Sequence, residues 1–287
     1  MLKTDTSELN LMIEGDANSE IVILLHGGPG VPDYLSEVSS LLNESYKVVR
    51  FDQRGTGESK CLNGSYEIEE YLYDIDQIIA FLHVDKVHLF GHSWGGLLAQ
   101  IYASKHPGNV KSLFLSSPSS GAGDVWKKME KEVMAYNKNK SSPAEWLYIG
   151  INSFFGITGF DRSYRNIFSL IWKYYFKTPS EAPKADKSWL SGIKADAVNK
   201  TRKSVISFDN KTLDKNLESF IAPVVTNFGS YDIYGASKKS INKRFPNMNY
   251  VTIEDSGHLP WIQNKHKFKL LLHDFYGTLQ TKARRLG

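Results

Sequence analysis

Cysteine is almost absent from this chain, whose 287 residues include a single one, Cys61. One thiol excludes an internal disulfide framework and a zinc site built from cysteines. Long apolar runs are also missing, since none reaches the ~18 residues that a membrane-spanning helix needs. The N-terminal stretch MLKTDTSELNLMIEGD carries charges where a signal peptide has an apolar centre. We therefore expect a cytoplasmic protein without membrane insertion.

Charge and glycine patterns exclude further classes. The formal net charge is only +4 and no long run of Lys and Arg occurs, so we expect no nucleic-acid partner. The glycine-rich segment RGTGESK lacks the spacing of a phosphate-binding loop. No group of His, Asp and Glu has metal-ligand spacing. We expect neither a metal nor an organic cofactor, and the composition leaves the oligomeric state open.

Short apolar runs alternate with segments of helical periodicity, which is typical of an α/β fold with a mostly parallel sheet. The apolar runs are nearly continuous, as in strands covered on both faces. Six strands are predicted, at residues 21–25, 46–51, 86–90, 110–116, 223–228 and 248–253. Helices are predicted at residues 67–83, 96–105 and 263–279.

This alternation stops between residues 121 and 219. The stretch holds 17 Lys and Arg against 11 Asp and Glu, and 15 of the 36 aromatic residues. It has helical patterns but no clear strand, and about a hundred residues between two strands favours an insertion. We therefore predict an α/β core at residues 1–120 and 220–287, with a helical cap at residues 121–219.

The strongest chemical signal is the sequence VHLFGHSWGG. Its central part, Gly91-His92-Ser93-Trp94-Gly95, fits the pattern G-x-S-x-G between an expected strand and an expected helix. A nucleophile on such a tight turn is exposed in a strained conformation, and the glycines remove Cβ atoms that would clash with the turn. The pattern predicts Ser93 as a catalytic nucleophile.

A serine nucleophile needs a base and an orienting acid. His258, in IEDSGHLPW, lies on a loop after the last expected strand and can reach Ser93 across the carboxyl edge of the sheet. Asp232, in GSYDIYG, follows the preceding strand, which gives the chain order Ser, Asp, His. Asp255 competes with Asp232, but it lies only three residues from His258. We favour Asp232 as the residue that holds the His258 tautomer.

Together with HGGPG at residues 26–30, DQRGTGES at residues 52–59, GSYD and SGH, these motifs resemble the α/β-hydrolase superfamily, and within it the proline iminopeptidase branch. The resemblance covers roughly residues 20–120 and 220–280. It implies a Ser93–His258–Asp232 triad under a helical cap. It also implies an oxyanion hole formed by the backbone N–H groups of Gly28 and Trp94. The segment 52–59 is expected to pack Asp52 and Arg54 beside the HGGPG loop.

The branch removes N-terminal residues, often proline, from small peptides, and carboxylates of its cap anchor the free amine. Glu145 and Asp161 are the candidate anchors here, and Trp146 is a candidate for the substrate pocket. The usual Trp- and Glu-rich cap pattern is absent, and the positive cap is a poor environment for a cationic group. The favoured prediction is an aminopeptidase acting on short peptides. A carboxylesterase or lactonase acting on a small apolar ester remains open, as does a small-molecule receptor on this fold.

Overall fold

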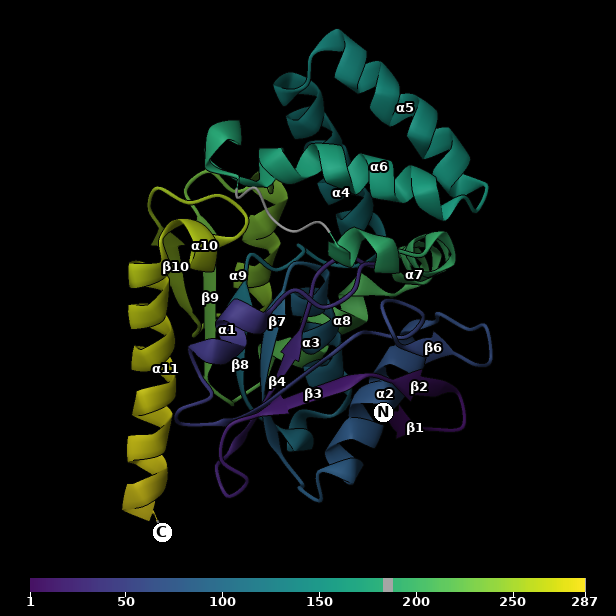
Figure 1. Cartoon of the computed structure of the whole chain (residues 1–287). Helices are drawn as coiled ribbons and strands as arrows, with labels where there is room; N and C mark the ends of the chain where they lie inside the picture. Colours follow the sequence, from purple (N-terminus) through teal and green to yellow (C-terminus); the bar gives the residue numbers. More distant parts are fainter. Residues whose placement is uncertain (183–187, 287) are drawn as a thin grey trace.

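A seven-stranded sheet forms the centre of the molecule (Figure 1), whose computed structural model describes residues 1–182 and 188–286. The strand order is β10-β9-β8-β7-β4-β5-β3, and every neighbouring pair is parallel except β3 with β5. The strands are β3 (Leu11–Glu14), β4 (Ile21–Leu25), β5 (Lys47–Phe51), β7 (Val87–His92), β8 (Val110–Ser116), β9 (Val224–Gly229) and β10 (Asn249–Ile253). All six predicted strands are present, and the predicted fold class is confirmed.

Four strands were not predicted. β3 is an antiparallel strand at the edge of the sheet, and its residues are partly exposed instead of continuously buried. The other three, β1 (Leu2–Lys3), β2 (Ser7–Leu9) and β6 (Lys60–Cys61), form a separate small antiparallel sheet. Strands of two or three residues are too short to show a period.

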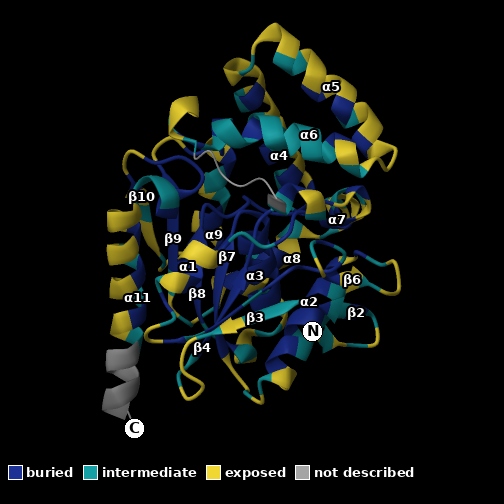
Figure 2. Cartoon of the chain, viewed as in Figure 1, coloured by how far each residue is buried: buried dark blue, intermediate teal, exposed yellow. Residues whose placement is uncertain are grey.

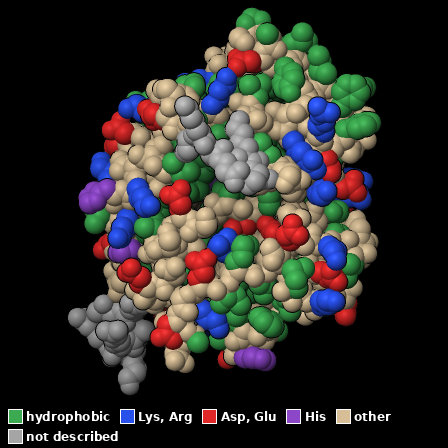
Figure 3. Space-filling model, in the orientation of Figure 1, with side chains coloured by type: hydrophobic (Ala, Val, Ile, Leu, Met, Phe, Trp, Pro, Cys, Tyr) green, Lys and Arg blue, Asp and Glu red, His purple; other side chains and the backbone are tan. Residues whose placement is uncertain are grey.

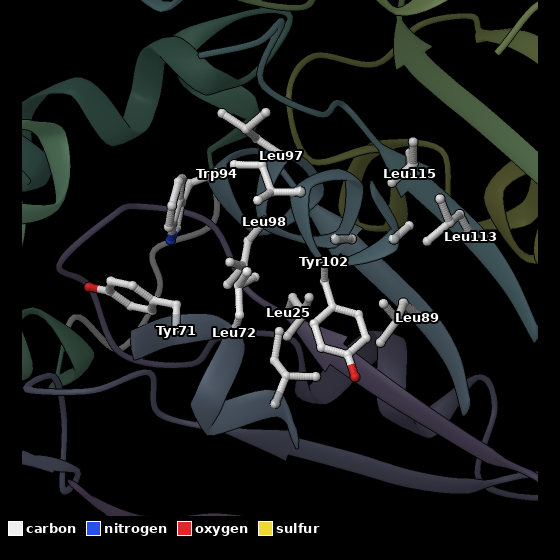
Figure 4. Packing of buried hydrophobic residues seen from close by; sticks show 14 of the residues in the cluster. Leu25, Tyr71, Leu72, Leu89, Trp94, Leu97, Leu98, Tyr102, Leu113 and Leu115 are labelled. Carbon is white, nitrogen blue, oxygen red and sulfur yellow. The ribbon is translucent and has the colours of Figure 1, made fainter. Parts of the chain in front are cut away.

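Two apolar clusters cover the two faces of the sheet, as the alternation of side chains along a strand requires. Ile23 and Leu25 of β4 belong to one cluster, whereas Val22 and Leu24 belong to the other. The first cluster includes residues of α2 (Ile68–Phe81) and α3 (Trp94–Lys105). Figure 4 shows Leu72 of α2 together with Trp94, Leu97 and Leu98 of α3 in this cluster. The second includes α11 (Lys265–Leu286), which begins after the short helix α10 (Pro260–Gln263).

The stretch between β8 and β9 contains helices and no strand in its described residues. It contains α4 (Gly123–Lys140), α5 (Pro143–Ile157), α6 (Asp161–Ile171), α7 (Ala195–Ser207) and α8 (Asn210–Glu218), with 3-10 turns η2 (Trp172–Tyr175), η3 (Pro179–Glu181) and η4 (Ser188–Gly192). In Figure 1, α4, α5 and α6 stand together above the sheet. α8 instead packs against α3, and its Leu213 and Leu217 are buried in the first core cluster. Residues of α4 and α7 also belong to this cluster, so the boundaries of the cap at 121 and 219 stay a prediction.

The remaining helical segments are short. They are α1 (Ser36–Ser40), η1 (Pro107–Asn109), η5 (Ala236–Ser240) and α9 (Ile241–Arg244). Within residues 1–182 and 188–286, no helix combines the length and the apolar composition needed to cross a membrane.

Candidate active site

Ser93 lies on the sharp turn between β7 and α3. Its backbone angles are φ 54° and ψ −121°, a conformation that side chains of L-residues rarely adopt. The neighbouring glycines are required by space. A Cβ atom on Gly91 would lie 2.5 Å from the Gly95 carbonyl oxygen, and one on Gly95 would lie 2.0 Å from the Leu25 carbonyl oxygen. The sequence therefore folds into this turn because its glycines let α3 start directly against the ends of β4 and β7.

Asp232 and His258 meet on the loops that follow β9 and β10. Asp232 Oδ1 lies 3.1 Å from His258 Nδ1, and both side chains are buried. A carboxylate only accepts hydrogen bonds, so Nδ1 carries the proton and Nε2 keeps its lone pair. The predicted base and acid are thus brought together with the tautomer that a general base requires.

The Asp232 carboxylate is held in its charged form. Burial alone would raise its pKa, but attraction to His258 and hydrogen bonds from His258, Ser117 and Tyr234 together keep the pKa below the ordinary value of 3.8. The Ser117 hydroxyl donates to Oδ2 at 2.5 Å, and the Tyr234 N–H donates to Oδ1 at 3.1 Å. These donors also fix the orientation of the carboxylate towards His258.

Asp255, the alternative acid, is placed elsewhere. Its side chain is exposed and accepts a hydrogen bond from Lys177 Nζ at 2.8 Å. The Lys177 hydrogen bond keeps the pKa of Asp255 below its ordinary value. The geometry therefore favours Asp232 over Asp255 as the partner of His258.

Tyr234 is a further member of the site that the sequence did not indicate. Its hydroxyl lies 3.0 Å from Ser93 Oγ and 2.8 Å from Ser119 Oγ. Burial raises the pKa of Tyr234 to about 12, so the hydroxyl stays protonated near neutral pH. Among the described hydrogen bonds, Ser93 Oγ has this contact and none to His258. Rotation of the short Ser93 side chain about its Cα–Cβ bond redirects its hydroxyl towards other partners.

His92, the residue before the nucleophile, joins the loops around the site. Its Nε2 donates to the His258 carbonyl oxygen at 2.9 Å, so its Nδ1 accepts from the Tyr34 hydroxyl at 2.6 Å. Tyr34 in turn accepts from the Gly27 N–H at 2.9 Å. Burial holds the pKa of His92 well below its ordinary value, so this imidazole stays neutral. His92 thereby positions the His258 loop relative to the HGGPG loop.

Gln53 connects the HGGPG loop to the nucleophile turn. Its side-chain amide donates to the His26 carbonyl oxygen at 2.8 Å and accepts from Trp94 Nε1 at 2.8 Å. Its backbone N–H donates to His26 Nε2 at 3.1 Å. The expectation that Arg54 packs beside the HGGPG loop is wrong, because the buried guanidinium instead binds Asp74 of α2. Within residues 52–59, Gln53 is the residue that binds His26 of the HGGPG loop through its side chain and its backbone N–H.

The two predicted oxyanion donors lie beside Ser93. Gly28 lines the cavity next to Ser93, and Trp94 is the first residue of α3. In the described part of the chain, neither backbone N–H appears in a hydrogen bond to a protein acceptor. A free N–H at the start of a helix also carries the positive end of the helix dipole. Both groups are thus available to a developing negative charge.

The cavity beside Ser93 is small and aromatic. It offers about 30 Å³, room for roughly one or two water molecules. Its described lining includes no Asp, Glu, Lys or Arg. The residues are Gly28, Val31, Tyr34, His92, Ser93, Phe168, Trp172, Tyr175, Trp189, His258 and Leu259. Among the described residues, no group of three or more His, Cys, Asp or Glu side chains could hold a metal ion.

The three cap residues predicted to bind substrate are not part of this lining. Glu145 accepts from the Ser142 N–H, from Lys173 Nζ and from the Tyr174 hydroxyl. Asp161 accepts from the Ala195 N–H at 2.8 Å and pairs with Lys194. Trp146 lines a separate groove on α5. The structure therefore gives both carboxylates a role in holding cap helices, and the prediction that they anchor a substrate amine is not supported.

The Glu145→Gln variant tests this structural role. The Lys173 and Ser142 hydrogen bonds lower the pKa of Glu145 to about 2. The charged Glu145 carboxylate therefore stabilises the fold at pH values above its ordinary pKa of 4.5, and this contribution is lost as the pH falls towards about 2. We expect the variant to melt slightly earlier at neutral pH, with kcat/KM within about twofold of wild type on free-amine and N-acylated substrates. A selective rise in KM for free amines would contradict this assignment.

Sequence comparison assigns most of the chain to one protein family. A family model described as the alpha/beta hydrolase fold matches residues 20–265. The chain belongs to the α/β-hydrolase family. This agrees with the motifs at Ser93 and in the HGGPG loop, and the predicted family is confirmed.

Curated relatives of this α/β hydrolase include proline iminopeptidases. It is 24% identical over 276 residues to that of Clostridioides difficile, covering 91% of each chain. It is 36% identical over 112 residues to that of Heyndrickxia coagulans, covering 38% of each chain. The first relatives are thus matched over about two fifths of their own length. The solved esterase of Exiguobacterium antarcticum superposes with a TM-score of 0.70 at 18% identity, covering 96% of this chain and 97% of the esterase, which shows the shared fold.

Proposed function

We propose that this α/β hydrolase is a serine hydrolase in which Ser93 is the nucleophile, His258 the general base and Asp232 the orienting acid. One observation carries the proposal: Ser93, on its strained turn, and His258 line the same cavity. The Nδ1 atom of His258 is bound by the buried Asp232 carboxylate at 3.1 Å. A histidine with a free Nε2 that lines the same cavity as a serine is the arrangement that can activate the serine hydroxyl.

The chemistry is a two-step acyl transfer. His258 Nε2 takes the Ser93 proton while Oγ, released from Tyr234, attacks the substrate carbonyl carbon. The N–H groups of Gly28 and Trp94 hold the oxyanion as the tetrahedral intermediate forms. His258 then gives its proton to the leaving group, whose bond to the acyl carbon breaks. Water, deprotonated by His258, attacks the acyl carbon, and the bond between this carbon and Ser93 Oγ breaks. His258 returns the proton to Oγ as the acid leaves, which restores the Ser93 hydroxyl.

We infer that the acyl group is small and uncharged, as in a short ester or lactone. A cationic amine normally requires a carboxylate, and the described lining of the cavity offers none. Trp172 lines the cavity, and its Nε1 is buried without a partner among the described residues. An indole N–H only donates, so it can bind a carbonyl or ester oxygen but not an ammonium group. The volume of about 30 Å³ favours acetyl-sized groups.

An aminopeptidase is the second candidate, and the likeness to proline iminopeptidases over 91% of the chain favours it. Five aromatic side chains line the cavity, namely Tyr34, Phe168, Trp172, Tyr175 and Trp189. Aromatic faces attract cations, so they offer an ammonium group a weaker substitute for a carboxylate.

A substrate panel separates the two candidates. Wild-type protein is assayed with p-nitrophenyl acetate, butyrate and octanoate, and with proline β-naphthylamide in its free and N-acetylated forms. We expect kcat/KM to be highest for acetate and to fall by about tenfold or more towards octanoate, because longer chains must displace the aromatic lining. Faster cleavage of proline β-naphthylamide than of any ester, abolished by N-acetylation, would overturn the ester proposal in favour of the aminopeptidase.

A further inference from the structure

Helix α5 of the cap turns its apolar face outward. The exposed fractions of Leu147, Ile151 and Phe154 are 65%, 50% and 66%. These residues recur at steps of four and three, so they share one face of the helix. Phe155, Ile157 and Phe160 extend the exposed surface beyond them. Figure 3 shows hydrophobic side chains gathered over this part of the cap, and Figure 2 shows that much of α5 is exposed.

The inward face of α5 makes both apolar and polar contacts, and its buried Ile149 packs in a cluster with Ile171 and Tyr174. Asn152 is buried and accepts from Asn166 Nδ2 of α6 at 2.8 Å. Asn199 Nδ2 of α7 donates to the Gly156 carbonyl oxygen at 3.0 Å. A surface helix normally places apolar residues inward and polar residues outward. Helix α5 departs from this rule because its outward face is also apolar, and exposed patches of this kind mark interaction sites.

The charges around this face are positive. Its two nearby carboxylates are neutralised, Glu145 by Lys173 and Asp161 by Lys194. Lys138 and Lys140 at the end of α4, and Arg162 at the start of α6, are exposed. Among the described residues, none of these three cations forms an ion pair. The apolar face, with an open groove of about 470 Å³ along it, is therefore bordered by free positive charge.

We propose that this face of the cap docks on the surface of an anionic lipid bilayer. The face consists of Leu147, Ile151, Phe154, Phe155, Ile157 and Phe160, bordered by the cations Lys138, Lys140 and Arg162. An exposed apolar helix face beside Lys and Arg suits the boundary between headgroups and acyl chains. A second copy of the chain fits less well, because a two-fold contact would bring the same positive borders together. The helix lies on the bilayer and does not cross it, and docking does not depend on the catalytic assignment.

Vesicle co-sedimentation of the full chain tests the proposal. Vesicles of phosphatidylcholine alone are compared with vesicles that also contain phosphatidylglycerol. We expect binding to the anionic vesicles to be about tenfold stronger or more. The double variant Leu147→Gln, Phe154→Gln should weaken it by about tenfold or more, because two large apolar groups are lost. Lys138→Glu with Lys140→Glu should reduce binding to the level seen with phosphatidylcholine alone.

Leu270→Gln on α11 is the matched control, since its side chain is 57% exposed and lies outside the cap. It should bind vesicles like wild type, and all variants should keep the wild-type melting temperature and ester hydrolysis in solution. Equal binding by wild type and the α5 double variant, or no binding to anionic vesicles, overturns the proposal. A dimer by light scattering that the α5 double variant abolishes also overturns it and assigns the face to self-association.

Discussion

The Ser93→Ala variant is expected to lower kcat/KM for p-nitrophenyl acetate by about 10⁴- to 10⁶-fold, because alanine has no oxygen that can form the acyl enzyme. The change removes one oxygen atom from a strained turn whose shape is set by Gly91 and Gly95, so the fold should persist. Stopped-flow or steady-state absorbance assays measure the loss, and thermal melting checks the fold. A fluorophosphonate probe should label the wild type and not the variant.

Ser119→Ala is the matched control for this variant. Ser119 is also buried and also contacts the Tyr234 hydroxyl, at 2.8 Å, but it does not lie on the nucleophile turn. We expect it to retain activity within about tenfold of wild type, since only one hydrogen bond to a neutral group is lost. If Ser93→Ala kept wild-type turnover, the assignment of Ser93 would be wrong. A wild-type protein that fails to react with the probe would favour ligand binding without turnover.

Asp232→Asn is expected to lower kcat by about 10⁴-fold, because an amide donor facing His258 Nδ1 favours the wrong imidazole tautomer. Asp255→Asn is the control and should leave kcat within about twofold of wild type, because its carboxylate is exposed and binds Lys177. The reverse result, with the larger loss at Asp255, would assign the orienting role to that residue.

The free energy of unfolding of the Asp232→Asn variant should also differ from that of wild type in its pH dependence. The folded-state pKa of Asp232 is lowered, so its carboxylate stabilises the fold above the ordinary value of 3.8, and this contribution is lost as the pH falls through the folded pKa. The free energy of unfolding of Asp232→Asn should therefore fall below that of wild type at neutral pH and approach it in acid. Denaturant titrations at both conditions measure the difference.

The parallel strands and the site residues on their connecting loops were predictable because each has a local cause. A strand buried on both faces needs a nearly continuous apolar run, which residues 21–25 and 110–116 show. The Ser93 turn needs glycines at fixed spacing, so it has a sequence pattern. The edge strand β3 lacks such a cause, because its partly exposed residues need not be apolar.

Contacts between distant segments were not predictable. Tyr234 reaches Ser93 across 141 residues of sequence, and Trp94 reaches Gln53 across 41. No period or motif links such pairs. Glu145 differs, because Ser142-Pro-Ala-Glu145 before an apolar run is the pattern of a helix capping box, which the structure contains. That pattern gave a local reason for the carboxylate and could have removed it from the candidate substrate anchors.

The strain at Ser93 has a consequence for how much sequence change the fold can accept. A residue held at φ 54° and ψ −121° costs about 1–3 kcal/mol. The free energy of unfolding of a domain is about 5–15 kcal/mol, so the strain of this one turn is a sizeable fraction of it. Substitutions elsewhere that would be neutral in an inert protein of this fold then fall nearer the threshold of unfolding. The strained backbone at Ser93, which the proposed nucleophile requires, thus lowers the number of substitutions that the fold can tolerate.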